Sequence, residues 1–288
     1  LSPAGDQLTL DFARELIRQE KLGQDDVPDY LSVSFSATDY VGHLFGASSL
    51  EAEDNILQLD RTLANLFTFI DQEIGLENTM IVLSADHGGP EAPGFLNSLG
   101  IRNAHYFDTD NLDREPAIAR LKQRFGIGKE LITMYSHPYI YLNRELIWDK
   151  GLDQSTVEQA VAEELRKFKG ISVAIPSSSL ASNSQPDTVL MRSVLNNYNA
   201  KRSGDIFVVF EPNVFINDFD GLIVASTHGS PWRYDTHVPV FFAGSGIGKK
   251  TVHRTVSPYD IAPTLAARLR IKPPSGAFGQ PLVEALSN

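Results

Sequence analysis

The sequence predicts a layered α/β fold in which helices cover both faces of a mainly parallel central sheet. Amphipathic helical segments alternate with short, continuous apolar runs, and such runs are typical of strands that are buried on both faces. Three of these runs are followed, within one to four residues, by Asp or His. These residues would lie at the carboxyl ends of the predicted strands, where parallel sheets bind ligands. The predicted strands are Tyr30–Phe35, Met80–Ala85, Gly221–Ala225 and Val238–Ala243.

The clearest helix is predicted from Leu50 to Ile74, where apolar residues recur at helical spacing. Ser48 and Glu51 are expected to form its capping box, and Gly75 suits the position after its end. Further start and stop signals predict helices over about Leu10–Leu22, from Ser155 to Gly170 with Glu158 in its capping box, and over Ile261–Leu269 after Ser257 and Asp260.

Residues 130–212 differ in pattern from the rest of the chain. Tyr139–Leu142, the helix after Ser155, Ile171–Ile175 and Ile206–Phe210 follow one another as strand, helix, strand and strand, and 176–186 is expected to be a loop. We therefore expect a small α+β lobe over 130–212, inserted into a main domain formed by 1–129 and 213–288.

Composition excludes several classes of function. The net charge of −11 comes without a Lys/Arg stripe, so a nucleic-acid-binding domain is not expected. No apolar run approaches the roughly 18 residues of a membrane span. Since the chain has no cysteine, any metal must be held by His and carboxylate side chains.

Five residues at the ends of predicted strands are candidate metal ligands. Asp39 and His43 follow the first run, Asp86 and His87 follow the second, and His228 follows the third. A single Asp or His beside a glycine is more often a turn residue, but three such groups at strand ends favour a metal site. Imidazole with carboxylate suits Zn²⁺, while Mn²⁺ and Co²⁺ are alternatives.

The remaining histidines are assigned differently. His237 lies nine residues after His228 and is an alternative ligand, or a residue that supports the ligands. His105, His137 and His253 lack an adjacent carboxylate at ligand spacing, so we interpret them as surface or structural residues.

The motifs around these candidates resemble the alkaline phosphatase superfamily, in its branch of zinc phosphatases and nucleotide pyrophosphatase/phosphodiesterases. The resemblance rests on Ser-Phe-Ser-Ala-Thr-Asp-Tyr-Val-Gly-His from Ser34, Leu-Ser-Ala-Asp-His-Gly from Leu83, Ser-Thr-His-Gly-Ser-Pro from Ser226, and Ser-Pro-Tyr-Asp-Ile-Ala-Pro-Thr-Leu from Ser257. It implies an alkaline-phosphatase-like fold and two zinc ions. One ion would be held by Asp39, His43 and His228, and the other in part by Asp86 and His87.

The resemblance also implies a nucleophilic Ser or Thr and a further Asp on segments well upstream of the first motif. Only 38 residues precede Asp39, and neither Ser2 nor Thr9 lies in the strand-then-turn setting of such a nucleophile. No catalytic residue is therefore identified. The chain is expected to be the C-terminal portion of the catalytic domain, with the N-terminal part of the same protein as a partner.

For the complete enzyme the resemblance implies hydrolysis of phosphate monoesters, by in-line attack of a zinc-activated hydroxyl and a covalent phospho-enzyme. A phosphodiesterase is the alternative enzyme, and a catalytically silent zinc-binding fragment or subunit is the alternative from another class. The resemblance also implies a periplasmic or secreted location.

Overall fold

The computed structural model describes residues 2–182, 184–219 and 221–286. The chain divides into two compact units, which are described separately. Unit 1 is Leu1–Gly88 with His237–Asn288, and unit 2 is Gly89–Thr236. The main domain and the inserted lobe expected from the sequence remain a prediction. Unit 2 contains the expected lobe, residues 130–212, together with flanking residues on both sides of it.

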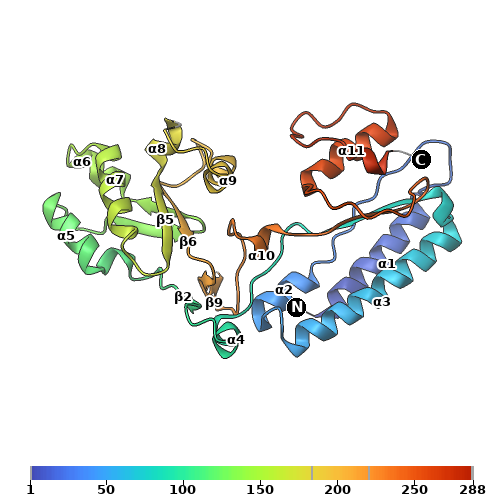
Figure 1. Cartoon of the computed structure of the whole chain (residues 1–288), viewed down its shortest axis with the longest axis horizontal. Helices are drawn as coiled ribbons and strands as arrows, with labels where there is room; N and C mark the ends of the chain where they lie inside the picture. The colour runs from blue at the N-terminus through green and yellow to red at the C-terminus, as the bar shows by residue number, and fades with distance from the viewer. Residues whose placement is uncertain (1, 183, 220, 287–288) are drawn as a thin grey trace. The chain divides into compact units, whose positions relative to one another are not determined.

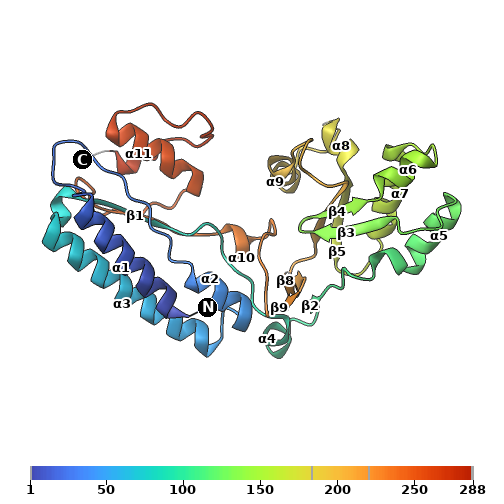
Figure 2. The same cartoon turned by 180° about the vertical axis from the view of Figure 1, so that it is seen from behind.

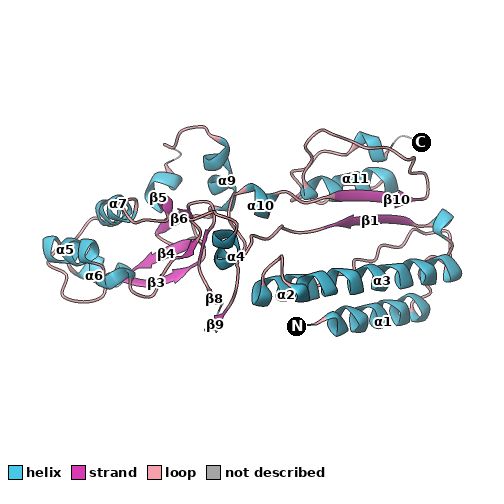
Figure 3. Ribbon diagram, turned by 60° about the horizontal axis from the view of Figure 1, so that its bottom comes forward, coloured by secondary structure: helices cyan, strands magenta, loops and turns pink. Residues whose placement is uncertain are grey.

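Unit 1 contains three helices, one pair of strands and a C-terminal helix in its described part. In chain order they are α1 (Pro3–Gln19), α2 (Ala37–Phe45), α3 (Leu50–Glu73), the 3-10 turn Leu76–Asn78, β1 (Met80–Ser84), β10 (Val240–Gly244), the 3-10 turn Pro258–Asp260, α11 (Ile261–Leu269) and the 3-10 turn Val283–Ala285. β1 and β10 pair as neighbours between α3, with α1 behind it, and α11 on the other side (Figure 3). Helices thus lie on both sides of the strand pair.

α1 and α3 lie side by side in Figure 1 and in the reverse view of Figure 2. Leu10 and Ile17 of α1 are buried, as are Leu66 and Phe69 of α3. Burial of side chains of this size stabilises the pair by roughly 1.5–3 kcal/mol each. Arg18 adds a contact over the Phe69 ring, with its guanidinium carbon 4.8 Å from the ring centroid.

The short helix α2 is held at its first turn by two polar contacts. The buried carboxylate of Asp6 accepts a hydrogen bond from the backbone N–H of Ala37 at 3.1 Å. The buried Asn55 of α3 donates its side-chain N–H to Thr38 Oγ1 at 2.9 Å. Because a nine-residue helix has little intrinsic stability, these contacts fix the helix that carries two of the candidate ligands.

Unit 2 consists of a four-stranded sheet with helices around it and two shorter strand pairs. Its elements are α4 (Pro93–Ser98), β2 (His105–Tyr106), the 3-10 turn Leu112–Arg114, α5 (Pro116–Arg124), β3 (Ile132–Ser136), β4 (Tyr139–Leu142), α6 (Arg144–Asp149), α7 (Gln154–Leu165), β5 (Ile171–Pro176), α8 (Ser177–Ala181), α9 (Val189–Asn197), β6 (Ile206–Phe210), β7 (Val214–Phe215), β8 (Asp218–Phe219), β9 (Leu222–Ile223) and α10 (Arg233–Thr236).

β6 shows how the sheet of unit 2 builds its core. The sheet has the order β3-β4-β6-β5, so β6 lies inside it. Ile206, Val208 and Phe210 point into the larger apolar cluster with α5 and α7, while Phe207 and Val209 point into a second cluster with α8 and α9. Helices therefore cover both faces, which explains the continuous apolar run in the sequence.

The predicted direction of the strands is wrong for the described part of the chain. β1 and β10 are antiparallel, every pair in the four-stranded sheet is antiparallel, and only β2–β7 is parallel. An apolar run reports that both faces of a strand are buried, but the path of the chain decides its direction. Two predicted strands also change. Tyr30–Phe35 forms no strand, and only Leu222–Ile223 of the third run pairs, in a short hairpin.

Helix boundaries differ from prediction where a neighbouring residue caps better. Ser49, not Ser48, caps α3 by accepting the Ala52 N–H. Asp153, not Ser155, caps α7. α1 begins at Pro3, seven residues before the predicted start, because Pro suits the first helical position. The expected loop 176–186 contains α8, whereas the capping box of Ser257 and Asp260 is confirmed.

In the described residues, no helix is both long and apolar enough to cross a membrane.

Candidate metal centre

Asp39 and His43 lie one turn apart on α2, so their side chains emerge from the same face of the helix. His43 Nε2 is 3.4 Å from Asp39 Oδ1. The His43 side chain is buried, whereas Asp39 is partly open to solvent. One face of α2 therefore carries two possible metal ligands, a buried imidazole from His43 and a partly exposed carboxylate from Asp39.

Asp86 and His87 follow β1 closely in unit 1. The His87 ring approaches Asp39 of α2, and Asp86 lies beside His87. His87 Nε2 is 3.8 Å from Asp39 Oδ1 and 3.5 Å from Asp86 Oδ2. β1 is fixed at this end by Ser84, whose hydroxyl donates to the Pro239 carbonyl at 3.0 Å. Four of the five predicted ligands are therefore brought together within unit 1.

The tautomer of His87 follows from its other nitrogen. His87 Nδ1 lies 2.8 Å from the Gly88 carbonyl oxygen, which can only accept a hydrogen bond. In the neutral ring Nδ1 therefore carries the proton, and Nε2 presents a lone pair toward Asp39 and Asp86. A backbone carbonyl that holds one imidazole nitrogen in this way is the usual support for a metal-binding histidine.

Two of these distances can be compared with the spacing of ligands around one cation. A charge-assisted N–H···O bond measures about 2.7–2.9 Å. Two ligands of one tetrahedral Zn²⁺, each about 2.0–2.1 Å from the ion, lie about 3.3–3.4 Å apart. The 3.4 Å between His43 and Asp39 equals that edge, and the 3.5 Å between His87 and Asp86 is close to it. The donor types and these two distances are thus compatible with a divalent metal ion.

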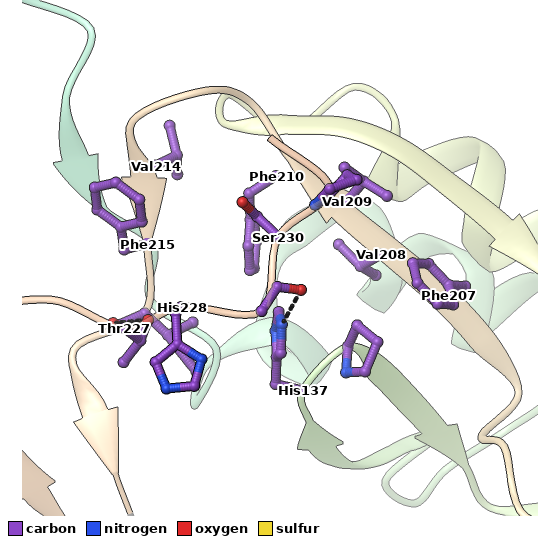
Figure 4. Close-up of a pocket in the computed structure, with 14 residues that line it drawn as sticks. His137, Phe207, Val208, Val209, Phe210, Val214, Phe215, Thr227, His228 and Ser230 are labelled. Atoms are coloured by element: carbon purple, nitrogen blue, oxygen red, sulfur yellow. Dashed lines mark hydrogen bonds between the residues drawn. The ribbon is translucent and has the colours of Figure 1, made fainter. Parts of the chain in front are cut away.

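His228 belongs to unit 2 and lies in the loop after β9. It borders a narrow hollow together with His137, Thr227 and Ser230, beside β6 and β7 (Figure 4). Thr227 on one side of it is anchored through its hydroxyl, which donates to the Ile216 carbonyl at 3.2 Å. The half-buried His228 is therefore carried by a loop with a defined backbone path.

The other histidines occupy separate places. His237 is exposed and lies between α10 and β10. His105 is in β2, where its Nδ1 lies 2.7 Å from the Asn103 carbonyl. His253 is exposed. His137 contacts the loop of His228, a relation between residues 92 positions apart that no local pattern could reveal.

The hydroxyls considered as nucleophiles from the sequence lie at or in α1. Ser2 precedes its first turn, and Thr9 donates to the Gly5 carbonyl at 3.2 Å within the helix. Thr38 lies next to Asp39, but its oxygen accepts the Asn55 N–H and serves to hold α2.

Comparison with known proteins identifies the family. The model of the type I phosphodiesterase / nucleotide pyrophosphatase family matches residues 5–231. The chain is 38% identical to a protein of Myroides odoratus named calcium-transporting ATPase, and 35% identical to alkaline phosphatase PafA of Elizabethkingia meningoseptica. Each alignment covers 99% of this chain and 51% of the relative, so the chain spans about half the length of these relatives.

The crystal structure of wild-type PafA superposes with a TM-score of 0.88 at 34% identity, covering 99% of this chain and 53% of that one. This match confirms the predicted alkaline-phosphatase-like α/β fold, with sheets that are mixed in direction. The chain belongs to the type I phosphodiesterase / nucleotide pyrophosphatase family, within the alkaline phosphatase superfamily.

Proposed function

We propose that this chain is the metal-binding part of a phosphate ester hydrolase, a phosphomonoesterase of the alkaline phosphatase type that uses two zinc ions. The observation that carries the proposal lies in unit 1, where His43 and His87 both approach Asp39 and Asp86 lies beside His87. Family membership and the similarity to alkaline phosphatase PafA support phosphoester chemistry.

One ion is assigned to Asp39, His43 and His228, and the other in part to Asp86 and His87. Asp39 and His43 of α2 supply two ligands, at the separation expected for two ligands of one tetrahedral ion. His228 is assigned as the third ligand because it lies in the Ser-Thr-His-Gly motif. Asp39 Oδ1 also faces His87 at 3.8 Å. That approach supports two neighbouring ions with Asp39 on the boundary between their ligand sets.

The residues of the chain have distinct tasks in this proposal. Asp39 and Asp86 supply the negative charge that holds divalent cations, while the imidazoles favour Zn²⁺ over harder cations, with Mn²⁺ and Co²⁺ as alternatives. The Gly88 carbonyl keeps His87 in the ligating tautomer. Bound zinc would polarise a phosphoryl oxygen and neutralise negative charge that develops in the transition state.

We further propose that the nucleophile is supplied by a polypeptide segment outside these 288 residues, the N-terminal part of the same protein. That the chain spans about half the length of its relatives is in keeping with this. The alternative is a catalytically silent chain, a fragment or paired subunit that binds zinc and requires another polypeptide to complete the site. A periplasmic or secreted location is proposed from the resemblance.

A nucleotide pyrophosphatase/phosphodiesterase is the second candidate function. It is favoured by the matching family model, whose description names phosphodiesterases, over residues 5–231. Both candidates use the same metal ligands, so substrate preference, rather than metal binding, separates them.

Zinc analysis combined with two hydrolysis assays tests the proposal. The purified chain is loaded with zinc, freed of excess ion, and assayed with an aryl phosphate monoester and the matching diester. Tightly bound zinc with little turnover supports a chain that needs a second segment, and robust turnover would overturn the external nucleophile. Turnover of the diester over the monoester would favour the second candidate.

Two variants make this test specific. His43→Ala removes a buried donor from α2 and should abolish tight zinc binding. His253→Ala, also in unit 1 but exposed, is the matched control and should bind zinc as the parent does. Equal zinc content in both variants would contradict the assignment of α2.

A further inference from the structure

We propose that His137 is a positioning residue for His228, which it serves by holding the carbonyl group of the next residue, Gly229. The inference rests on the proposed function, because it takes His228 as a metal ligand. It assigns a role to a histidine that its sequence context marks only as surface or structural. All the contacts on which it depends lie within unit 2.

The His137 ring is the middle member of a chain of two hydrogen bonds. Its Nε2 lies 3.2 Å from the Gly229 carbonyl oxygen, and its Nδ1 lies 2.8 Å from the hydroxyl of Tyr135. A carbonyl only accepts, so Nε2 carries the proton and donates it. Nδ1 is then the acceptor for the Tyr135 hydroxyl. A dashed line in Figure 4 marks the hydrogen bond that the His137 ring makes with the Gly229 carbonyl.

The environment keeps both groups in the protonation states that this chain needs. Desolvation is the main influence on His137 and lowers its pKa, although the residue retains exposed surface, while Gly229 and Asp235 act in the opposite direction. The neutral ring is the form that can both accept and donate. Burial raises the pKa of Tyr135 far above its usual range, so its hydroxyl stays a donor.

Gly229 is shaped to receive this ring. Its φ of +103° lies in a region that residues with a side chain rarely adopt. A Cβ at this position would lie 2.9 Å from His137 Nε2. The absence of a side chain at residue 229 therefore allows both the turn after His228 and the close approach of the imidazole.

Other contacts also anchor this loop. Ser230 donates from its backbone N–H to Asp235 Oδ2 at 2.7 Å. Trp232 donates from its indole N–H to the Phe210 carbonyl at 3.0 Å. On the other side of His228, Thr227 is tied to Ile216. The bond from His137 to the Gly229 carbonyl and the bond from the Ser230 N–H act on the same peptide unit, the one between Gly229 and Ser230. Together they restrict the backbone angle ψ of Gly229 and the direction of that peptide.

Loss of this bond is expected to weaken zinc binding moderately. Without it the loop samples more orientations, and the metal has to select the ligating one. A neutral hydrogen bond of this length typically corresponds to about a five- to tenfold change in an equilibrium constant. Residues that orient metal ligands typically change metal affinity about 10- to 100-fold, and we expect the lower end, because His137 holds the backbone and not the His228 ring.

The test compares three variants with the parent in zinc affinity, measured by competition with a chromophoric chelator. His137→Ala removes the donor and should weaken zinc binding about five- to tenfold. His137→Gln keeps a side-chain N–H at similar reach and should restore most of the loss. His105→Ala is the matched control, since His105 is in β2 of unit 2 and bonds to Asn103.

A second measurement uses the metal-free protein. The amide of Ser230, next to Gly229, should exchange its hydrogen faster in His137→Ala than in the parent, and at the parental rate in His137→Gln. Nitrogen NMR should show His137 as the Nε2–H tautomer. Tyr135→Phe keeps the aromatic ring and leaves the Gly229 carbonyl as acceptor, so this variant should retain the same tautomer.

These outcomes separate the two proposals. If His228→Ala still binds zinc as the parent does, the assignment of His228 fails, while the exchange and tautomer results still decide whether His137 holds the loop. If His228→Ala loses zinc but His137→Ala matches the parent in zinc affinity and Ser230 exchange, the positioning role is refuted. Failure of His137→Gln to rescue would refute it as well.

Discussion

Asp205 is predicted to be a principal polar support of unit 2, and its replacement by Ala gives the sharpest stability test. Its carboxylate is 1% exposed and lies just before β6. It accepts hydrogen bonds from the Leu142 N–H at 2.7 Å, the Arg144 guanidinium at 2.6 Å and the Gln154 amide at 3.1 Å. It therefore ties the end of β4 and the starts of α6 and α7 to the sheet.

The expected loss follows from these three partners. A bond from a buried backbone N–H to a charged acceptor is worth about 1.5–3 kcal/mol, and the Gln154 bond about 0.5–1.5 kcal/mol. The Arg144 side chain is 62% exposed, so water replaces its partner and it adds at most about 1 kcal/mol. Asp205→Ala should thus lower the free energy of unfolding of unit 2 by about 3 kcal/mol.

Urea denaturation followed by tryptophan fluorescence measures this loss, because both tryptophans, Trp148 and Trp232, belong to unit 2. A loss of about 3 kcal/mol should lower the urea midpoint by about 1–2 M. The control is Asp187→Ala, because the ion pair of Asp187 with Arg192 is exposed on both sides and should matter by less than about 0.5 kcal/mol. If the two variants unfold at the same midpoint, the reasoning about Asp205 is refuted.

Three further predictions concern pH and packing. Burial raises the pKa of Asp6 above its usual value of 3.8, so unit 1 should lose stability as the pH rises from about 3.8 through the raised pKa. The Asp6→Asn variant cannot ionise and should lack this loss. If its stability depends on pH as that of the parent does, the reasoning is contradicted. Arg254 holds the pKa of Glu284 at about 2, so the stabilisation by this pair should be present above pH 4.5 and fade toward pH 2; Glu284→Gln should remove that dependence in thermal melts. Gly204→Ala would place a Cβ 2.6 Å from Tyr139 Cβ and should destabilise unit 2 by about 1–3 kcal/mol, which a parental urea midpoint would contradict.

Local features of the fold could be predicted from the sequence because neighbouring residues determine them. The helix from Leu50 and the strand Ile206–Phe210 lie where periodicity and apolar runs place them. The cap of α7 could not be predicted in this way. Ser155 and Asp153 lie two residues apart and both carry a side-chain oxygen that can accept the capping hydrogen bond, so only the geometry of the folded chain decides between them.

Features that depend on the path of the chain could not be predicted in this way. Tyr30–Phe35 has a strand-like composition, yet strand formation requires a pairing partner, which composition does not supply. The antiparallel pairing of β1 with β10 reflects a return over more than 150 residues.

The candidate site shows the same division between local and distant information. The pairing of Asp39 with His43 depends on one turn of α2, which is a local feature, although the sequence signals predict no helix over Ala37–Phe45. The approach of His87 to Asp39, and the contact of His137 with Gly229, join distant segments. His87 is a candidate because it follows a predicted strand beside Asp86, whereas His137 lacks an adjacent carboxylate at ligand spacing.

The zinc content of the purified chain, measured by elemental analysis after dialysis against a weak chelator, tests the central claim most directly. The account predicts at least one tightly held zinc ion per chain, lost in His43→Ala and in His228→Ala but retained in His237→Ala. A parent chain that retains no zinc, or a loss in His237→Ala without a loss in His228→Ala, would contradict it.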